Sequence, residues 1–182
     1  MSRIRSIVAG IAAGAAGTTA LNAVTFADMA VRARAASTTP DDTVEKAEEL
    51  AGVSLSEKGS DSDDAGNRRS ALGSLMGIAA GLGTGALYGL VRPRLGRRVP
   101  LALLGVGAGL AANVGTTGPM AALGITDVRT WPANSWVSDL VPHLAYGIAT
   151  AAVFDLMCPG GRWQQPARGG AASRKRTGIE PA

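Results

Sequence analysis

Four long stretches of the chain carry no charged residue, and the charged residues are concentrated between them. These stretches cover residues 6–27, 70–91, 99–126 and 140–154. A helix over the first stretch would be about 33 Å long, which exceeds the roughly 30 Å hydrocarbon core of a bilayer. The pattern therefore predicts membrane spans.

Helix-start and helix-end signals refine the bounds to residues 6–27, 70–91, 100–120 and 139–157. Pro100 suits a first helical turn, and Gly118-Pro119 suits a helix end. Ser138 is predicted as the N-cap of the last helix, which puts Pro142 in its first turn, where the missing N–H needs no partner. Because the stretches lack the alternation of barrel strands, we expect an all-α integral membrane bundle of four transmembrane helices.

Two other interpretations stay open. A soluble helical protein rich in alanine and glycine is one, and the lack of charge over four segments argues against it. A cleaved signal peptide is the other, since Arg3 and Arg5 precede the first apolar run. That run is too long for a typical signal peptide, so a retained first helix is favoured.

The segment 28–69 carries ten acidic and six basic residues and has its own helix signals. A short amphipathic helix is predicted, with Thr39 as N-cap, Pro40 at the first position and Gly52 as its stop. Its apolar stripe is Val44, Ala47, Leu50 and Ala51, and Asp41 and Asp42 form an acidic first turn. Residues 59–67, rich in serine, aspartate and glycine, are predicted to be flexible.

Composition narrows the chemistry further. The chain of 182 residues is 46% hydrophobic but only 4% aromatic, with 25 glycines, and its 18% charged residues are below the roughly 25% of soluble proteins. The single cysteine, Cys158, and the single histidine, His143, exclude an intramolecular disulfide and zinc sites that need several such ligands. We expect no metal and no cofactor.

The basic residues predict which side of the membrane each connection faces. They gather before the first span, between the second and third spans, and in the tail: Arg3, Arg5, Arg92, Arg94, Arg97, Arg98, Arg162, Arg168, Arg174, Lys175 and Arg176. The positive-inside rule then predicts that both termini are cytoplasmic and that residues 28–69 lie outside. Four arginines flank spans on the predicted outer side and argue against this orientation: Arg32, Arg34, Arg68 and Arg69. Anionic lipid head groups are the expected partners of the basic connection and tail, in preference to nucleic acid.

This topology divides the chain into two regions, one within the membrane and one outside it. Residues 1–158 form the transmembrane domain, and residues 159–182 form a basic cytoplasmic tail that we expect to be disordered. Trp131 and Trp136 are predicted in the outer aromatic belt, and Trp163 near the inner one.

The second span contains glycines at strict four-residue intervals: Gly73, Gly77, Gly81, Gly85 and Gly89. Overlapping G-x-x-x-G units let another helix backbone approach closely, so this glycine stripe predicts a helix-packing surface, a glycine zipper. Gly10 with Gly14, and Gly105 with Gly109, offer matching small surfaces. Intramolecular packing is favoured, and homo-oligomerisation and a pore lining stay open. Gly81, Gly83 and Gly85 resemble part of a dinucleotide loop, but no strand precedes them.

Polar residues recur on the helix faces near the predicted outer ends. Asp139, His143, Tyr146 and Thr150 share one face, Thr18, Asn22 and Thr25 another, and Asn113, Thr116 and Thr117 a third; Asp28 and Arg32 form an i, i+4 pair. The predicted polar pocket consists of Asn22, Asp28, Asn113, Asp139, His143 and Tyr146. One interpretation is an outward-open site for a small ligand, ion or proton, and the favoured one is hydrogen bonding between helices. Asp155 is expected to pair with an arginine of the basic connection.

Two of these stretches also carry a resemblance. Residues 22–40, NAVTFADMAVRARAASTTP, and residues 136–147, WVSDLVPHLAYG, resemble small uncharacterised multi-pass membrane proteins of high-GC Gram-positive bacteria, and more faintly the YagU-like inner-membrane proteins. The resemblance covers roughly residues 5–157 and implies a bacterial inner membrane, with no catalytic role.

Two functions stay open, and neither is enzymatic, because no catalytic motif defines a reaction. The first is a structural or partner-binding membrane protein, packed through its glycine zipper, whose outer segment is a contact surface. The alternative is a small transporter or channel subunit with an outward-facing polar pocket around His143.

Overall fold

A computed structural model describes residues 2–56, 62–95 and 99–158 of the chain. The long elements in these ranges are helices: α1 Arg3–Arg32, α2 Thr39–Ala51, α3 Ser62–Val91, α4 Leu101–Ala122 and α5 Ala133–Met157. Two 3₁₀ turns, η1 Arg92–Arg94 and η2 Val128–Thr130, follow α3 and precede α5. Within the described ranges, α1, α3, α4 and α5 are long and apolar enough to cross a membrane, which confirms the predicted fold class.

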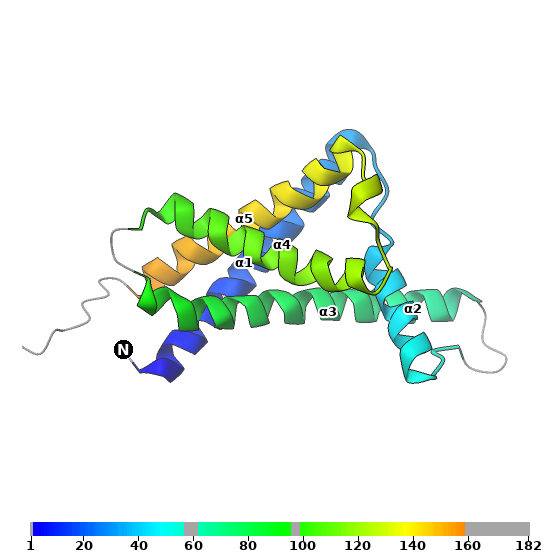
Figure 1. The fold of residues 1–182 in the computed structure, drawn as a ribbon, viewed down its shortest axis with the longest axis horizontal. Helices are drawn as coiled ribbons and strands as arrows, with labels where there is room; N and C mark the ends of the chain where they lie inside the picture. The colour runs from blue at the N-terminus through cyan, green and yellow to red at the C-terminus, as the bar shows by residue number, and fades with distance from the viewer. Residues whose placement is uncertain (1, 57–61, 96–98, 159–182) are drawn as a thin grey trace, which may run out of the picture.

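Successive spans alternate in direction (Figure 1). The start of α1, the α3–α4 connection and the end of α5 lie at one end, and α2 and the α4–α5 connection lie at the other. α1 packs against both α3 and α5, α5 packs against α4, and α2 packs on α3, whereas α3 and α4 meet at few positions. α3 and α4 are therefore held together mainly through α1 and α5.

The first and second long helices continue past the uncharged stretches that predicted them. α1 runs on to Arg32 and ends at Ala33, which has a left-handed φ of 49°. α3 begins at Ser62, so residues 62–67 form the first turns of a helix, whereas the sequence predicted a flexible segment there. Residues 59–61 of that predicted segment lie outside the described residues. Asp63 and Asp64 in the first turn of α3 favour this start, because carboxylates stabilise a helix N-terminus.

The ends of α4 and α5 also differ from the prediction. α5 begins at Ala133, and Ser138 is not its N-cap, because its hydroxyl instead donates to the Asn134 carbonyl at 2.9 Å. Pro142 therefore lies inside the helix and leaves the carbonyl four residues earlier without its usual donor. α4 continues beyond Pro119 to Ala122.

Small side chains form most of the interior. The buried apolar residues include Ala9, Ala13, Ala108, Ala112 and Ala151, whereas large side chains such as Leu75, Leu87, Leu103, Val114 and Leu156 are exposed. Since lipid is as apolar as leucine, burying large side chains adds little in a membrane, and close backbone contact is the available stabilising force. The interior and exterior are arranged as a lipid-facing bundle requires.

Candidate functional site

Three members of the glycine stripe bring the backbones of α1 and α3 together. A Cβ added to Gly85 would lie 2.6 Å from the Gly14 Cα, and one added to Gly89 would lie 3.0 Å from the Gly10 Cα. Gly81 faces the Thr18 hydroxyl of α1. The contact that Gly10 and Gly14 were predicted to offer is thus occupied within the chain.

The other two glycines of the stripe face different surroundings. Gly73 lies against Pro40 of α2, where an added Cβ would approach the Pro40 carbonyl oxygen at 2.9 Å. Gly77 has no described atom within 4 Å of such a Cβ. The stripe winds around α3, so its two ends meet two different helices.

A second close contact joins α4 to α5 through Gly105, Gly109 and Gly147. A Cβ on Gly109 would lie 3.0 Å from the Leu144 Cα, and one on Gly147 would lie 2.7 Å from the Gly109 Cα. Sequence reasoning did not single out Gly147, because no glycine lies four residues away from it in the chain.

Tyr146 lies at the junction of α1, α3 and α5. It is almost completely buried, and its hydroxyl donates to the Gly81 carbonyl at 2.6 Å. The side chains of Tyr146 and the buried Thr150 also lie against Gly17 of α1, where an added Cβ would meet both of them. This hydrogen bond ties the glycine stripe to α5.

Asn113, Thr116, Asp139 and His143 form a group between α4 and α5, here called the α4–α5 polar cluster. Asn113 Nδ2 donates to the Asp139 carboxylate and lies 3.3 Å from His143 Nδ1. His143 Nδ1 is 2.7 Å from the Asp139 carbonyl oxygen, and Nε2 is 3.4 Å from the Thr116 hydroxyl. Because a carbonyl oxygen only accepts, Nδ1 carries a hydrogen in that bond.

Asp28 belongs to a separate group at the C-terminal end of α1. Arg32 and Arg34 each donate to its Oδ2 at 2.5 Å, which confirms the predicted Asp28–Arg32 pair. The Ser138 hydroxyl lies 3.5 Å from the same oxygen and accepts a hydrogen bond from Arg32, so the group connects α1 to α5.

The predicted six-residue pocket is consequently distributed over four places. Asn113, Asp139 and His143 meet, whereas Tyr146 faces α1 and α3, Asp28 lies in its own ion-pair group, and Asn22 is exposed. The reason is that α1 and α4 both pack on α5, so residues on one face of α5 reach different neighbours.

Glu48 and Arg69 fasten α2 to the N-terminal part of α3, and sequence reasoning predicted no contact between them. Arg69 Nε donates to Glu48 Oε2 at 2.6 Å, and the Leu55 N–H donates to Oε1 at 2.7 Å. The Arg69 guanidinium first, and then the Leu55 N–H, hold the pKa of Glu48 below its ordinary value. We call this group, completed by the 3.3 Å Glu45–Arg69 contact, the α2–α3 clasp.

The clasp changes which face of α2 is buried. Val44 and Glu48 are buried against the bundle, whereas Ala47, Leu50 and Ala51 of the predicted apolar stripe are exposed. The helix begins at Thr39 after Thr38 as N-cap, one residue earlier than predicted, and ends at Gly52 as predicted, with a left-handed φ of 64°.

One predicted contact and one that was not predicted lie at opposite ends of the bundle. Arg92 of η1 donates to both oxygens of Asp155, at 3.1 and 3.2 Å, which confirms the expected pairing with the basic connection. Trp131 and Trp136 form an edge-to-face pair with ring centroids 5.3 Å apart. Trp163 and the tail 159–182 lie outside the described residues.

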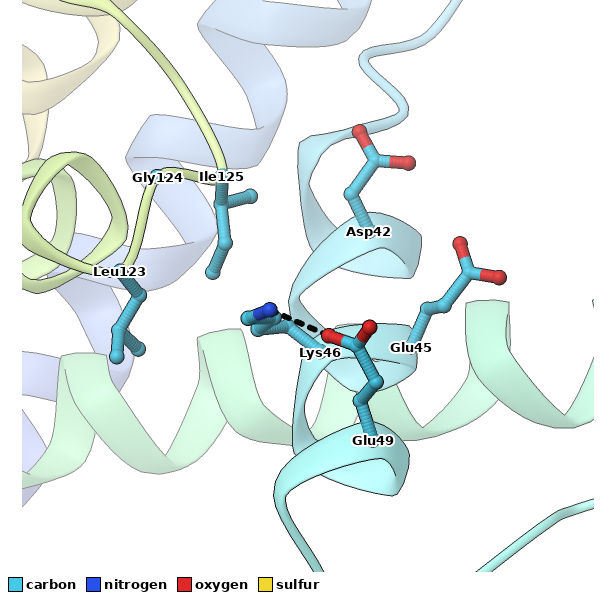
Figure 2. Close-up of a pocket in the computed structure, with 7 residues that line it drawn as sticks. All are labelled: Asp42, Glu45, Lys46, Glu49, Leu123, Gly124 and Ile125. Atoms are coloured by element: carbon cyan, nitrogen blue, oxygen red, sulfur yellow. Dashed lines mark hydrogen bonds and ion pairs between the residues drawn. The ribbon is translucent and has the colours of Figure 1, made fainter.

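A cleft of about 320 Å³ separates α2 from the end of α4. Asp42, Glu45, Lys46 and Glu49 line its α2 side, and residues 123–125 line the other. Figure 2 shows Leu123 and Ile125 on the wall opposite α2, with Lys46 extending from α2 into the space between the walls while it pairs with Glu49. We call this cleft, which lies at the α2 end of the bundle, the outer groove.

Among the described residues, no three histidine, cysteine, aspartate or glutamate side chains gather as a metal site would require. In comparisons with family models, curated proteins and solved structures, nothing matches this chain.

Proposed function

We propose that this chain is a structural, partner-binding membrane protein whose four spans hold α2 in a fixed position for a partner outside the membrane. The α2–α3 clasp carries the proposal. It consists of a buried carboxylate with two donors, Arg69 Nε and the Leu55 N–H, and it lies in a segment outside the apolar spans. A short helix needs tertiary contacts to stay folded, and the clasp supplies them.

The occupation of the glycine stripe supports α2 as the contact surface. Gly81, Gly85 and Gly89 are covered by α1 and Gly73 by α2, so those positions serve the fold of one chain. A partner, or a second copy in a homo-oligomer, would have to bind elsewhere, and α2 offers a fixed and exposed face.

We place the protein in a bacterial inner membrane with both termini cytoplasmic, on the basis of the charge pattern and the family resemblance. Arg3, Arg5, Arg92 and Arg94 all belong to the end of the bundle opposite α2. This clustering suits anionic head groups of the cytoplasmic leaflet.

Photo-crosslinking in cells tests the proposal. A benzophenone amino acid at Leu50 of α2 is expected to give a discrete protein adduct, and the same group at Leu103, exposed on α4, is expected to give none. The Arg69→Met substitution should abolish the Leu50 adduct by releasing α2. The proposal is wrong if Leu50 gives no adduct, or if the adduct persists unchanged in Arg69→Met.

The α4–α5 polar cluster favours a second candidate function, a small transporter or channel subunit. An imidazole, a carboxylate and an amide meet between two spans, with His143 and Asp139 side chains 15% and 22% exposed. Ionisable groups within spans commonly mark ion or proton pathways. Liposomes containing the protein should then dissipate an imposed pH gradient faster than liposomes containing His143→Gln. Equal rates for both, matching protein-free liposomes, would exclude this candidate.

A further inference from the structure

The side of α2 that lines the outer groove carries acidic side chains and continues into an apolar one. Asp42, Glu45 and Glu49 lie along the outer groove, with Glu45 and Glu49 side chains 60% and 67% exposed. Leu50 lies one helical turn beyond Lys46, so it continues the same stripe, and it is 68% exposed. Of the predicted apolar stripe, Val44 is thus buried, and Leu50 lies on an open surface.

The opposite wall of the outer groove is apolar. Leu123 and Ile125, which follow α4, line this wall opposite α2 (Figure 2). The clasp fixes the α2 wall, because Glu48 holds Arg69 of α3 and accepts the Leu55 N–H. A groove with fixed walls binds at a lower entropic cost than one that must first become ordered.

The net charge of the groove favours a positively charged partner. Three carboxylates line it. Glu49 pairs with Lys46, and Glu45 contacts Arg69 of the clasp at 3.3 Å, so three negative charges against two positive ones leave the groove with one net negative charge. A second copy of α2 would set carboxylates against carboxylates, and an anionic bilayer surface would be repelled in the same way. A partner that carries both cationic and apolar side chains gains binding free energy from the carboxylates and from the apolar wall.

We infer that the outer groove binds an amphipathic segment of another protein that carries lysine or arginine beside an apolar stripe. This inference rests on the proposed function and names the chemistry of its partner. The basic side chains of the segment lie along Asp42, Glu45 and Glu49, and its apolar side chains contact Leu50, Leu123 and Ile125.

The test uses the full chain in nanodiscs of zwitterionic lipid. The probe is a short fluorescent helical peptide with leucine on one face and lysine on the other, and a matched peptide has glutamate in place of lysine. Binding to empty nanodiscs is subtracted. The lysine peptide should bind and the glutamate peptide should not. The double substitution Asp42→Asn with Glu49→Gln should weaken binding by about tenfold or more, since close charge pairs add affinity.

A matched control removes two acids away from the groove. Asp63→Asn with Asp64→Asn changes the net charge equally in the first turn of α3 and should alter binding by less than about twofold. Ile125→Ser should weaken binding by about tenfold through the apolar wall, with the clasp intact by hydrogen exchange.

Three outcomes overturn the inference. They are equal weakening by the groove and control pairs, equal binding of both peptides, and binding no stronger than to empty nanodiscs. If any of these occurs while the Leu50 crosslink in cells persists, α2 still contacts a partner, and the basic chemistry assigned to that partner is wrong.

Discussion

Arg69 of α3 donates a hydrogen bond to the buried Glu48 of α2 at 2.6 Å, across 21 positions of the chain. This contact fixes α2, a short helix that is not one of the four candidate membrane spans. Pro40 of α2 also lies against Gly73, so the helix is held at two points along α3. The position of α2 therefore depends on a charge pair and on one glycine.

Replacing Glu48 by glutamine should loosen α2. The charge that Arg69 Nε contacts is removed while the shape of the side chain is kept, so hydrogen exchange of the amides in residues 39–55 should rise by about tenfold or more. Glu49→Gln is the matched control, because Glu49 is exposed and contacts Lys46 instead. It should change exchange by less than about twofold. Equal exchange in both variants would contradict the role of the clasp.

The clasp should also weaken in acid. The Arg69 guanidinium holds the pKa of Glu48 below its ordinary value, which is about 4.3 in an unfolded chain. The stabilisation is fully present above that ordinary value and is lost as the pH falls through the lowered folded-state pKa. Hydrogen exchange of α2, corrected for its intrinsic pH dependence, should be flat from neutral pH to about 5 and rise in stronger acid. A rise of equal size in Glu48→Gln would show that another group titrates.

The four spans were predictable because absence of charge over a membrane thickness is a local property of the sequence. The ends of the helices were harder to predict. Hydropathy marks the part of a helix that lies within lipid, and the backbone hydrogen bonding of the helix can continue beyond that part. α1 continues to Arg32, and α3 begins eight residues before its uncharged stretch, at Ser62. A charged side chain beyond the hydrocarbon core stays in water and costs the helix little, so the charge pattern does not mark where a helix ends.

Gly85→Ala should destabilise the fold, whereas Gly77→Ala should not. An added Cβ at Gly85 meets the backbone of Gly14, which cannot move aside as a side chain would, and overpacking of this kind costs about 1–3 kcal/mol. At Gly77 no described atom lies within 4 Å of the added Cβ. Unfolding in detergent, followed by circular dichroism, measures the difference. If Gly85→Ala instead changed the oligomeric state at unchanged stability, the stripe would serve assembly between copies.

The candidate site was predictable wherever it depended on spacing within one helix. Asp28 and Arg32 lie one turn apart and pair, and Gly10 and Gly14 share a face that meets α3. Contacts that depend on how helices cross were not predictable. Neither Glu48 with Arg69 nor Gly147 against α4 follows from any spacing in the sequence, because both need the order in which the helices pack.

Tyr146→Phe should lower stability without disturbing the packing of the ring. The variant keeps the buried ring and removes the hydroxyl that donates to the Gly81 carbonyl, a bond worth about 0.5–1.5 kcal/mol, with values near 0.6 typical inside membranes. Thr19→Val is the matched control, because it removes an exposed hydroxyl that bonds within its own helix, to the Ala15 carbonyl. Unfolding in detergent should show a loss of stability for Tyr146→Phe that exceeds the loss for Thr19→Val.

Because α3 and α5 are joined through this bond, a cysteine pair linking the two helices should also form more slowly in Tyr146→Phe. Unchanged stability together with an unchanged crosslinking rate would mean that the glycine contacts alone hold α5 in place.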